Sequence, residues 1–177
     1  LQWREQRPDI IYIFSKDILR HRRAQKEDAV WLKKGEEYKD ETLSVRAFGS
    51  TDVGVSFLLQ ASGKKIFHAG DLNNWHWMDE STEAEWKGAE KNFLHELDDL
   101  YAYTPEVDVA MFPVDPRLGK EYMRGAGQFV TKIKTHIFVP MHFTPEYAKA
   151  NAFRDFAEAH GVRFVSLTHR GQKIEIE

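Results

Sequence analysis

The first part of the chain alternates short apolar runs with turn residues, a pattern typical of strands. Ile10 to Phe14 is a β-branched and aromatic run, and Thr42 to Phe48 is a second one. Gly54 to Ala61 and Lys65 to His68 follow as a pair joined by the turn sequence Ser62-Gly63-Lys64. The pattern therefore predicts an antiparallel β region.

The next segment has the period of an amphipathic helix. Thr82 followed by Glu85 is a capping box, in which each side chain bonds the backbone N–H of the other residue. Apolar residues then recur at helical spacing, namely Trp86, Ala89, Phe93, Leu97 and Leu100. We interpret this stripe as the core-facing side of a long helix.

Strands and helices alternate through the remainder of the chain. Thr144 is the expected N-cap of a helix, with Pro145 as its first residue and Gly161 beyond its end. Before that helix, the expected elements are a strand at Val107 to Phe112, a helix at Tyr122 to Lys134 and a strand at Ile137 to Val139. After it, strands are expected at Arg163 to Leu167 and at Lys173 to Ile176. The order predicts an α/β fold with parallel pairing late in the chain.

Composition limits the classes of function. The 177 residues include 25 Lys and Arg and 28 Asp and Glu, so a net charge of −3 gives no strong case for nucleic acid or an anionic membrane. The polar segment Lys16 to Glu27, expected to be helical, carries Arg20-His21-Arg22-Arg23, which either faces a phosphate or is a solvated surface. The absence of cysteine excludes thiolate metal sites and favours a cytoplasmic chain.

The chain has neither an apolar run of the roughly 20 residues that a membrane helix needs nor an N-terminal signal peptide. Leu1 to Pro8 resembles the end of a helix, which suggests a fragment or a processed form. We expect one domain covering residues 1–177 and leave its oligomeric state open.

Two polar residues lie just beyond the ends of predicted strands. Asp71 comes after the small residues Ala69 and Gly70, which allow a sharp turn at a strand end. His142 follows the apolar run ending at Pro140. Each residue alone has a simpler interpretation, as a loop-capping aspartate or a histidine near a helix start. Together they suggest a metal site, because such sites are commonly assembled at the ends of different strands.

The order of three strings carries a family resemblance. His-Ala-Gly-Asp at 68–71, Val-Asp-Val-Ala-Met-Phe-Pro at 107–113 and Val-Pro-Met-His at 139–142 resemble the second half of the metallo-β-lactamase superfamily. More narrowly, they are similar to its metal-dependent hydrolases related to ascorbate-phosphate lactonases. The resemblance covers nearly the whole chain and implies a partial four-layer αββα sandwich.

The resemblance also implies a site and a reaction. Asp71 would bridge two divalent ions, zinc or manganese, and His142 would ligate the second ion, with a bridging hydroxide attacking an ester, lactone or phosphodiester in a small-molecule substrate. The family's His-x-His-x-Asp-His string is absent here, which implies that the N-terminal portion of the domain is missing. The alternative is an incomplete fragment that binds no metal alone, acting as a binding or structural module or needing a complementing segment.

Further candidates surround this pair. Where many family members have another histidine, Asp52 or Thr51 is either an oxygen ligand or part of a plain turn. His68 either orients a ligating carboxylate or packs at a strand end. Asn73 and Trp75 are predicted at the substrate rim. Asp115 and Arg117 follow the strand at Val107 and are also predicted to point at this rim. Arg117 either holds an anionic group of the substrate there or forms a surface ion pair with Asp115.

Overall fold

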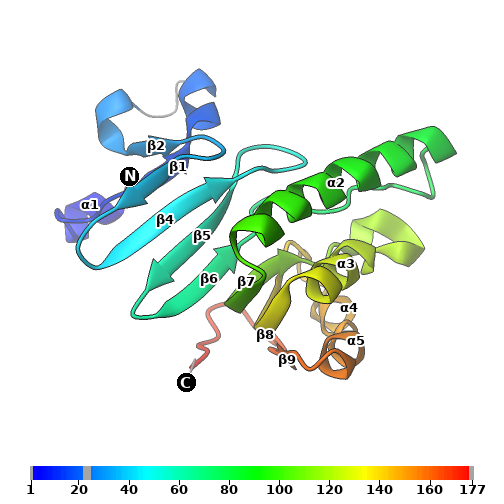
Figure 1. Cartoon of the computed structure of the whole chain (residues 1–177). Coiled ribbons are helices and arrows are strands. Elements are labelled where there is room, and N and C mark those ends of the chain that lie inside the picture. The colour runs from blue at the N-terminus through cyan, green and yellow to red at the C-terminus, as the bar shows by residue number, and fades with distance from the viewer. Residues whose placement is uncertain (1, 22–24, 176–177) are drawn as a thin grey trace.

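The structure, a computed structural model that describes residues 2–21 and 25–175, contains one large mixed sheet with helices on one side (Figure 1). The seven strands follow one another across the sheet in chain order. Pairing is antiparallel from β3 to β6 and parallel from β6 to β9. The strands are β3 (Glu37–Lys39), β4 (Leu43–Phe48), β5 (Ser56–Ala61), β6 (Lys64–His68), β7 (Glu106–Pro113), β8 (Lys134–Met141) and β9 (Arg163–Phe164).

The strand register separates two apolar faces. Phe67 of β6 pairs with Ala110 of β7, which pairs with Phe138 of β8, and all three belong to the main core. Their neighbours in sequence point the other way because side chains alternate along a strand. Val109 and Ile137 accordingly belong to a separate cluster on the opposite face.

Helices cover the face that carries the main core. These are α2 (Glu83–Tyr103), α3 (Arg124–Lys132), α4 (Tyr147–Asn151) and α5 (Arg154–Ala159). The predicted capping box of Thr82 and Glu85 is confirmed, with both reciprocal bonds formed. Phe93, Leu97 and Leu100 of the predicted stripe are fully buried.

A two-stranded parallel ribbon packs on the other face. It consists of β1 (Ile13–Ser15) and β2 (Val30–Leu32), and Leu32 is buried with Val45 of β4. The α/β class expected from the sequence is confirmed. The described residues form a helical layer, the seven-stranded sheet and this ribbon, so the second sheet of the expected sandwich is represented here by two strands.

Three elements differ from expectation near the N-terminus. The predicted helix at Lys16 to Glu27 is instead a 3₁₀ helix at Lys16–His21 and another at Lys26–Asp28. Residues 22–24, which include the last two arginines of the Arg20-His21-Arg22-Arg23 group, lie outside the described part. The strands β2 and β3 were not predicted, because three-residue strands carry too little periodicity to detect. A short helix, α1 (Trp3–Gln6), precedes them.

The expected helix start at Thr144 is wrong. Thr144 has a φ of 34°, outside the helical region, and α4 begins at Tyr147. The predicted final strands are also wrong beyond Phe164, because β9 ends there and residues 173–175 form no strand, while residue 176 lies outside the described part of the chain. Both backbone polar groups of Leu167 bond the amide of Asn151, so they are not available to a partner strand.

None of the helices that the structure describes is long and apolar enough to cross a membrane.

A 3₁₀ segment, Pro116–Glu121, interrupted at Gly119, leads from β7 into α3. The fold thus places three neighbouring parallel strand ends, those of β6, β7 and β8, along one edge.

Candidate metal centre

Asp71, Asp115 and His142 meet at the carboxyl edge of the parallel strands. Asp71 follows β6, Asp115 follows β7 and His142 directly follows β8. Because β6, β7 and β8 are parallel neighbours, the loops after them leave the sheet at the same edge. This edge is where α/β sheets commonly bind ligands.

The imidazole of His142 lies between the two carboxylates. Its Nε2 is 3.3 Å from Oδ1 of Asp71, and its Nδ1 is 2.9 Å from Oδ2 of Asp115. The side chains of His142 and Asp71 are 32% and 39% exposed, whereas that of Asp115 is fully buried. Solvent and small ions can therefore reach the side of the imidazole that faces Asp71.

The Ala69-Gly70 pair positions Asp71 as the sequence suggested. Ala69 is buried and donates its N–H to Met111 O at 2.9 Å, extending the pairing of β6 with β7. Gly70 then turns the chain with a φ of 57°. A Cβ at Gly70 would lie 2.9 Å from the backbone oxygen of Val55, so only glycine fits without displacement.

His142 occupies a strained backbone conformation. Its φ is 64°, in the left-handed region that residues with a Cβ rarely adopt. The adjacent residue Met141 accepts the N–H of Val114 at 3.0 Å, which ties the ends of β7 and β8 together. Such strain persists where the surroundings impose it, and it is concentrated at functional sites.

Asp115 is held by Arg117. The Nε of Arg117 donates to both carboxylate oxygens at 3.0 Å, its Nη2 donates to Oδ2 at 2.5 Å, and its backbone N–H donates to Oδ1 at 3.0 Å. Burial acts to raise the pKa of Asp115, but the bonds from Arg117 outweigh it and the net pKa is lowered. The carboxylate is therefore a buried anion, and the ion pair is not the surface pair expected from the sequence.

Trp75 contacts both predicted ligands. Its Nε1 donates to the backbone oxygen of Asp71 at 2.8 Å, and its ring meets the His142 ring edge-on with centroids 5.3 Å apart. Trp77 stacks on Trp75. Trp75 is partly exposed, so a role at the substrate rim stays a prediction.

The structure corrects the expected position of Asn73. Its side chain is fully buried and its Oδ1 accepts the N–H of Asn74, while its backbone is tied to the hydroxyl of Thr51. A side chain enclosed in this way cannot line an exposed rim. Thr51 is likewise engaged with the loop that follows Asp71.

The described hydrogen bonds of His68 and Asp52 are local. The Nδ1 of His68 accepts the N–H of Gly70 at 3.1 Å, and although the ring is exposed, partial desolvation lowers its pKa. Asp52 is exposed in a turn, with its N–H donated to Ser50 Oγ. Within residues 2–21 and 25–175, no three His, Asp or Glu side chains are grouped so that they could hold a metal ion.

The atoms that do converge suit a divalent cation. An ionised Asp115 only accepts hydrogen bonds, so Nδ1 of His142 donates to it, and Nε2 is the nitrogen that faces the partly exposed Asp71 and is available to a metal ion. Two ligands at zinc distances from one ion lie about 3.0–3.5 Å apart for angles between 90° and the tetrahedral angle. The observed separation of 3.3 Å fits this range. The pair supplies part of a coordination shell.

Comparison with known proteins rests on structure. No family model matches the sequence, and no curated protein matches it significantly. A protein from Parabacteroides distasonis described as a metal-dependent hydrolase superposes with a TM-score of 0.60 at 15% identity, over 89% of this chain and 64% of that one. Igni18, a metallo hydrolase from Ignicoccus hospitalis, gives 0.60 at 16% identity, over 92% and 67%.

A third structure names the fold. YhfI from Bacillus subtilis, a metallo-β-lactamase fold protein, superposes with a TM-score of 0.55 at 7% identity, over 93% of this chain and 65% of that one. The chain has a metallo-β-lactamase-like fold. It spans about two thirds of the length of these proteins. At these identities the similarity establishes the fold of the chain and not its reaction.

Within the metallo-β-lactamase-like fold, the contact of Asp115 with His142 was not predicted from the sequence. Asp115 was predicted to point at this edge beside Arg117, without a contact to His142. The signal was present, because Asp115 follows β7 in the same way that Asp71 follows β6 and His142 follows β8. Three polar residues after three neighbouring parallel strands predict convergence, once the strand order is known.

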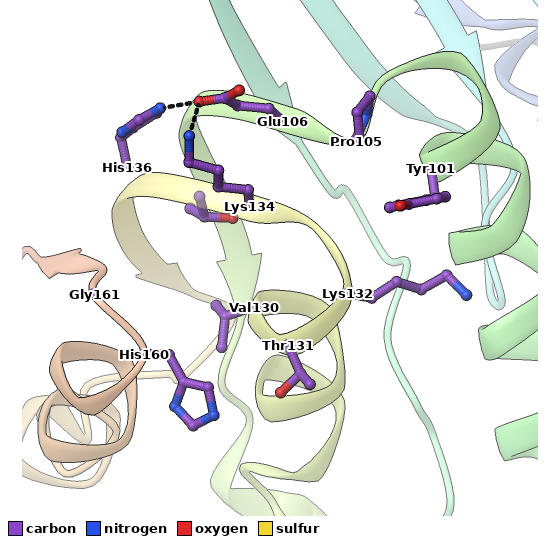
Figure 2. A pocket seen from close by; sticks show the side chains of 11 residues that line it. Tyr101, Pro105, Glu106, Val130, Thr131, Lys132, Lys134, His136, His160 and Gly161 are labelled. Atoms are coloured by element: carbon purple, nitrogen blue, oxygen red, sulfur yellow. Dashed lines mark hydrogen bonds and ion pairs between the residues drawn. The ribbon is translucent and has the colours of Figure 1, made fainter.

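The opposite ends of β7 and β8 border a groove of about 620 Å³ (Figure 2). There Glu106 pairs with Lys134 at 2.8 Å and with His136 at 2.5 Å, as the dashed lines show. Lys134 and His136 lower the pKa of Glu106. All three side chains are at least 43% exposed. Exposed ion pairs of this kind contribute little to the free energy of unfolding. The pairs at Glu106 therefore differ from the ion pair of the buried Asp115, although both lie at ends of β7 and β8.

Proposed function

We propose that this chain contributes Asp71 and His142 as ligands to the metal centre of a metal-dependent hydrolase. The observation that supports this most directly is the 3.3 Å approach of a carboxylate oxygen and an imidazole nitrogen at the carboxyl edge of parallel strands. The similar structures described as metal hydrolases support the same reaction class. Esters, lactones and phosphodiesters are the substrate classes we propose.

The residues have distinct roles in this proposal. Two divalent ions, zinc or manganese, would supply Lewis acidity and an activated water. Asp71 would hold the ions through an anionic carboxylate, and His142 would provide an imidazole nitrogen to one of them. Asp52 remains a proposed oxygen ligand that would favour manganese.

The surroundings bear on the substrate. Trp75 and Trp77 form a partly exposed aromatic surface beside His142, which suits a flat or sugar-like small molecule. Arg117 keeps a half-exposed guanidinium near the same edge. We place the activity in the cytoplasm because the sequence has no cysteine that would indicate an oxidising compartment.

The experiment compares Asp71→Asn and His142→Ala with the unchanged chain. Zinc and manganese binding is measured by titration calorimetry, and hydrolysis is measured on an ester, a lactone and a phosphodiester. Both variants should bind metal at least tenfold more weakly, because each loses a direct ligand. His136→Ala and Glu106→Gln, at the opposite ends of β7 and β8, are matched controls that should bind as the unchanged chain does. Equal metal binding by all five proteins would refute the proposal.

A second candidate function follows from the small number of converging ligands. Among the described residues no group of three possible ligands is formed, which supports an incomplete site that needs a complementing segment or acts as a binding module. Elemental analysis of the purified chain separates the two. Stoichiometric metal with hydrolysis favours the enzyme, whereas a metal-free chain without hydrolysis favours the incomplete site.

A further inference from the structure

We propose that Asp115, clamped by Arg117, is a positioning residue that fixes the tautomer and orientation of His142. The inference rests on the proposed function, in which Nε2 of His142 is a metal ligand. It assigns a role to a buried carboxylate that neither binds metal in that proposal nor lies at the surface.

The first step concerns the proton on His142. Two groups face Nδ1, namely Oδ2 of Asp115 at 2.9 Å and Nη2 of Arg117 at 3.4 Å. The guanidinium nitrogen already donates to Asp115 at 2.5 Å, so the shorter contact from Nδ1 is to an anionic acceptor. Nδ1 therefore donates its hydrogen to Asp115. A neutral imidazole then has its lone pair on Nε2, because the Asp71 carboxylate on that side is farther away, at 3.3 Å, and 39% exposed to water.

The second step concerns rigidity. Arg117 binds both oxygens of Asp115 through its side chain and one of them through its backbone N–H, so the carboxylate has little freedom to rotate. A two-point guanidinium–carboxylate pair fixes geometry as well as charge. Because Asp115 is fully buried, water does not compete for the bond to His142.

The third step explains why His142 needs this support. Its backbone is in the left-handed conformation, and its side chain lies at an edge where it is 32% exposed. The described contacts of the ring are Trp75, the guanidinium of Arg117 and the two carboxylates. Trp75 selects no tautomer. Asp71 faces Nε2 at 3.3 Å and is 39% exposed, whereas Asp115 faces Nδ1 at 2.9 Å and is fully buried, so Asp115 is the stronger acceptor and determines which nitrogen of the neutral ring carries the proton.

The test uses the complete chain labelled with ¹⁵N-histidine. In the metal-free protein at about pH 8.5, long-range ¹H–¹⁵N spectra report the tautomer of each neutral imidazole. His142 should be held as the Nδ1–H form. Asp115→Asn should convert it to a mixture containing the Nε2–H form, and zinc titration should show an affinity lower by about 10–100-fold.

Two further variants complete the design. Arg117→Met, at a half-exposed position, leaves the carboxylate but loosens it, so a smaller loss of zinc affinity is expected, under about tenfold. If Asp115→Asn does not fold, the tautomer and zinc affinity of Arg117→Met decide the question. Glu106→Gln is the control, because it removes the carboxylate facing His136 and should change the His136 signals alone.

The outcomes separate this proposal from the proposed function. If Asp71→Asn and His142→Ala bind zinc as well as the unchanged chain, the metal centre itself is wrong. If those two variants lose zinc while Asp115→Asn, or Arg117→Met in its place, leaves either the His142 tautomer or the zinc affinity unchanged, only the positioning role is wrong. The tautomer measurement needs no metal, so it stands independently of activity.

Discussion

At the scale of single residues, Gly70 determines the path of the chain from the end of β6 to Asp71. Its φ of 57° and the close backbone oxygen of Val55 leave no room for a side chain. Gly63, in the turn between β5 and β6, has a φ of 75°, but a Cβ added there would meet no described atom within 4 Å. Both glycines therefore have a backbone conformation that disfavours a side chain, but only at Gly70 would a side chain also clash with a neighbouring atom.

Gly70→Ala should destabilise the fold by more than Gly63→Ala and should also weaken metal binding. Both substitutions carry the left-handed cost of about 1–2 kcal/mol, and Gly70→Ala adds the clash with Val55. Urea unfolding gives the stabilities, and zinc titration gives the affinities. Equal effects of the two substitutions on both quantities would show that the backbone at Gly70 does not position Asp71.

The candidate ligands Asp71 and His142 were predicted from the sequence because each lies just beyond the end of a predicted strand. Asn73 was placed wrongly, since a loop residue gives no local sign of whether its side chain faces solvent or is enclosed. Asp115 was interpreted only locally because its contact with His142 depends on the order of β7 and β8 in the sheet. Contacts between separate loops require the topology, which local patterns do not contain.

At the scale of elements, Asp40 organises the connection between β3 and β4. Its Oδ1 accepts the N–H and hydroxyl of Thr42 and the N–H of Leu43, and its Oδ2 accepts the hydroxyl of Tyr38. The bonds from the backbone and side chain of Thr42, followed by that from Leu43, lower the pKa of Asp40 to about 2. The ionised carboxylate is thus the form that stabilises this turn.

Asp40→Ala should lower the unfolding midpoint at neutral pH, and the difference should disappear in acid. The folded pKa is depressed, so the stabilisation is complete above the ordinary value of 3.8 and is lost as the pH falls through about 2. Thermal melts between pH 7 and pH 2 measure this. Glu41→Gln, one residue away and exposed, controls for loss of a surface charge. A difference that is constant over this pH range would contradict the assigned cause.

Element ends were the least predictable part of the fold. The long helix α2 was predicted because its capping box and apolar stripe are local signals. The strand after α5 ended early because Asn151 bonds Leu167 and Gln172 bonds Ser166 and Thr168, so side chains replace the ladder. Side-chain bonds that take the place of strand pairing depend on which residues meet in the folded chain, and they produce no periodic pattern in the sequence.

At the scale of the whole molecule, the helical layer and the candidate site are joined by a polar network at Glu90. This α2 residue accepts from Asn74 in the loop after Asp71 at 3.3 Å, and from Arg124 at 2.7 Å and Gln128 at 2.5 Å in α3. Asn74 is fully buried and also bonds Gln128. The network therefore connects two helices to the loop that carries Asp71.

Glu90→Gln should reduce the free energy of unfolding by about 1.5–3 kcal/mol, because all three bonds are accepted by Oε1 and a neutral amide oxygen accepts them more weakly than a carboxylate. The bond from Arg124 is the main cause of the lowered pKa of Glu90, so its stabilisation is present above the ordinary value of 4.5 and is lost as the pH falls below it. Urea unfolding at pH 7 and at pH 3 should show the difference shrinking. Glu83→Gln, in the exposed first turn of the same helix, should cost under about 0.5 kcal/mol at either pH. If the two substitutions lowered the free energy of unfolding by similar amounts, Glu90 would not be the residue that connects the helices to the loop carrying Asp71.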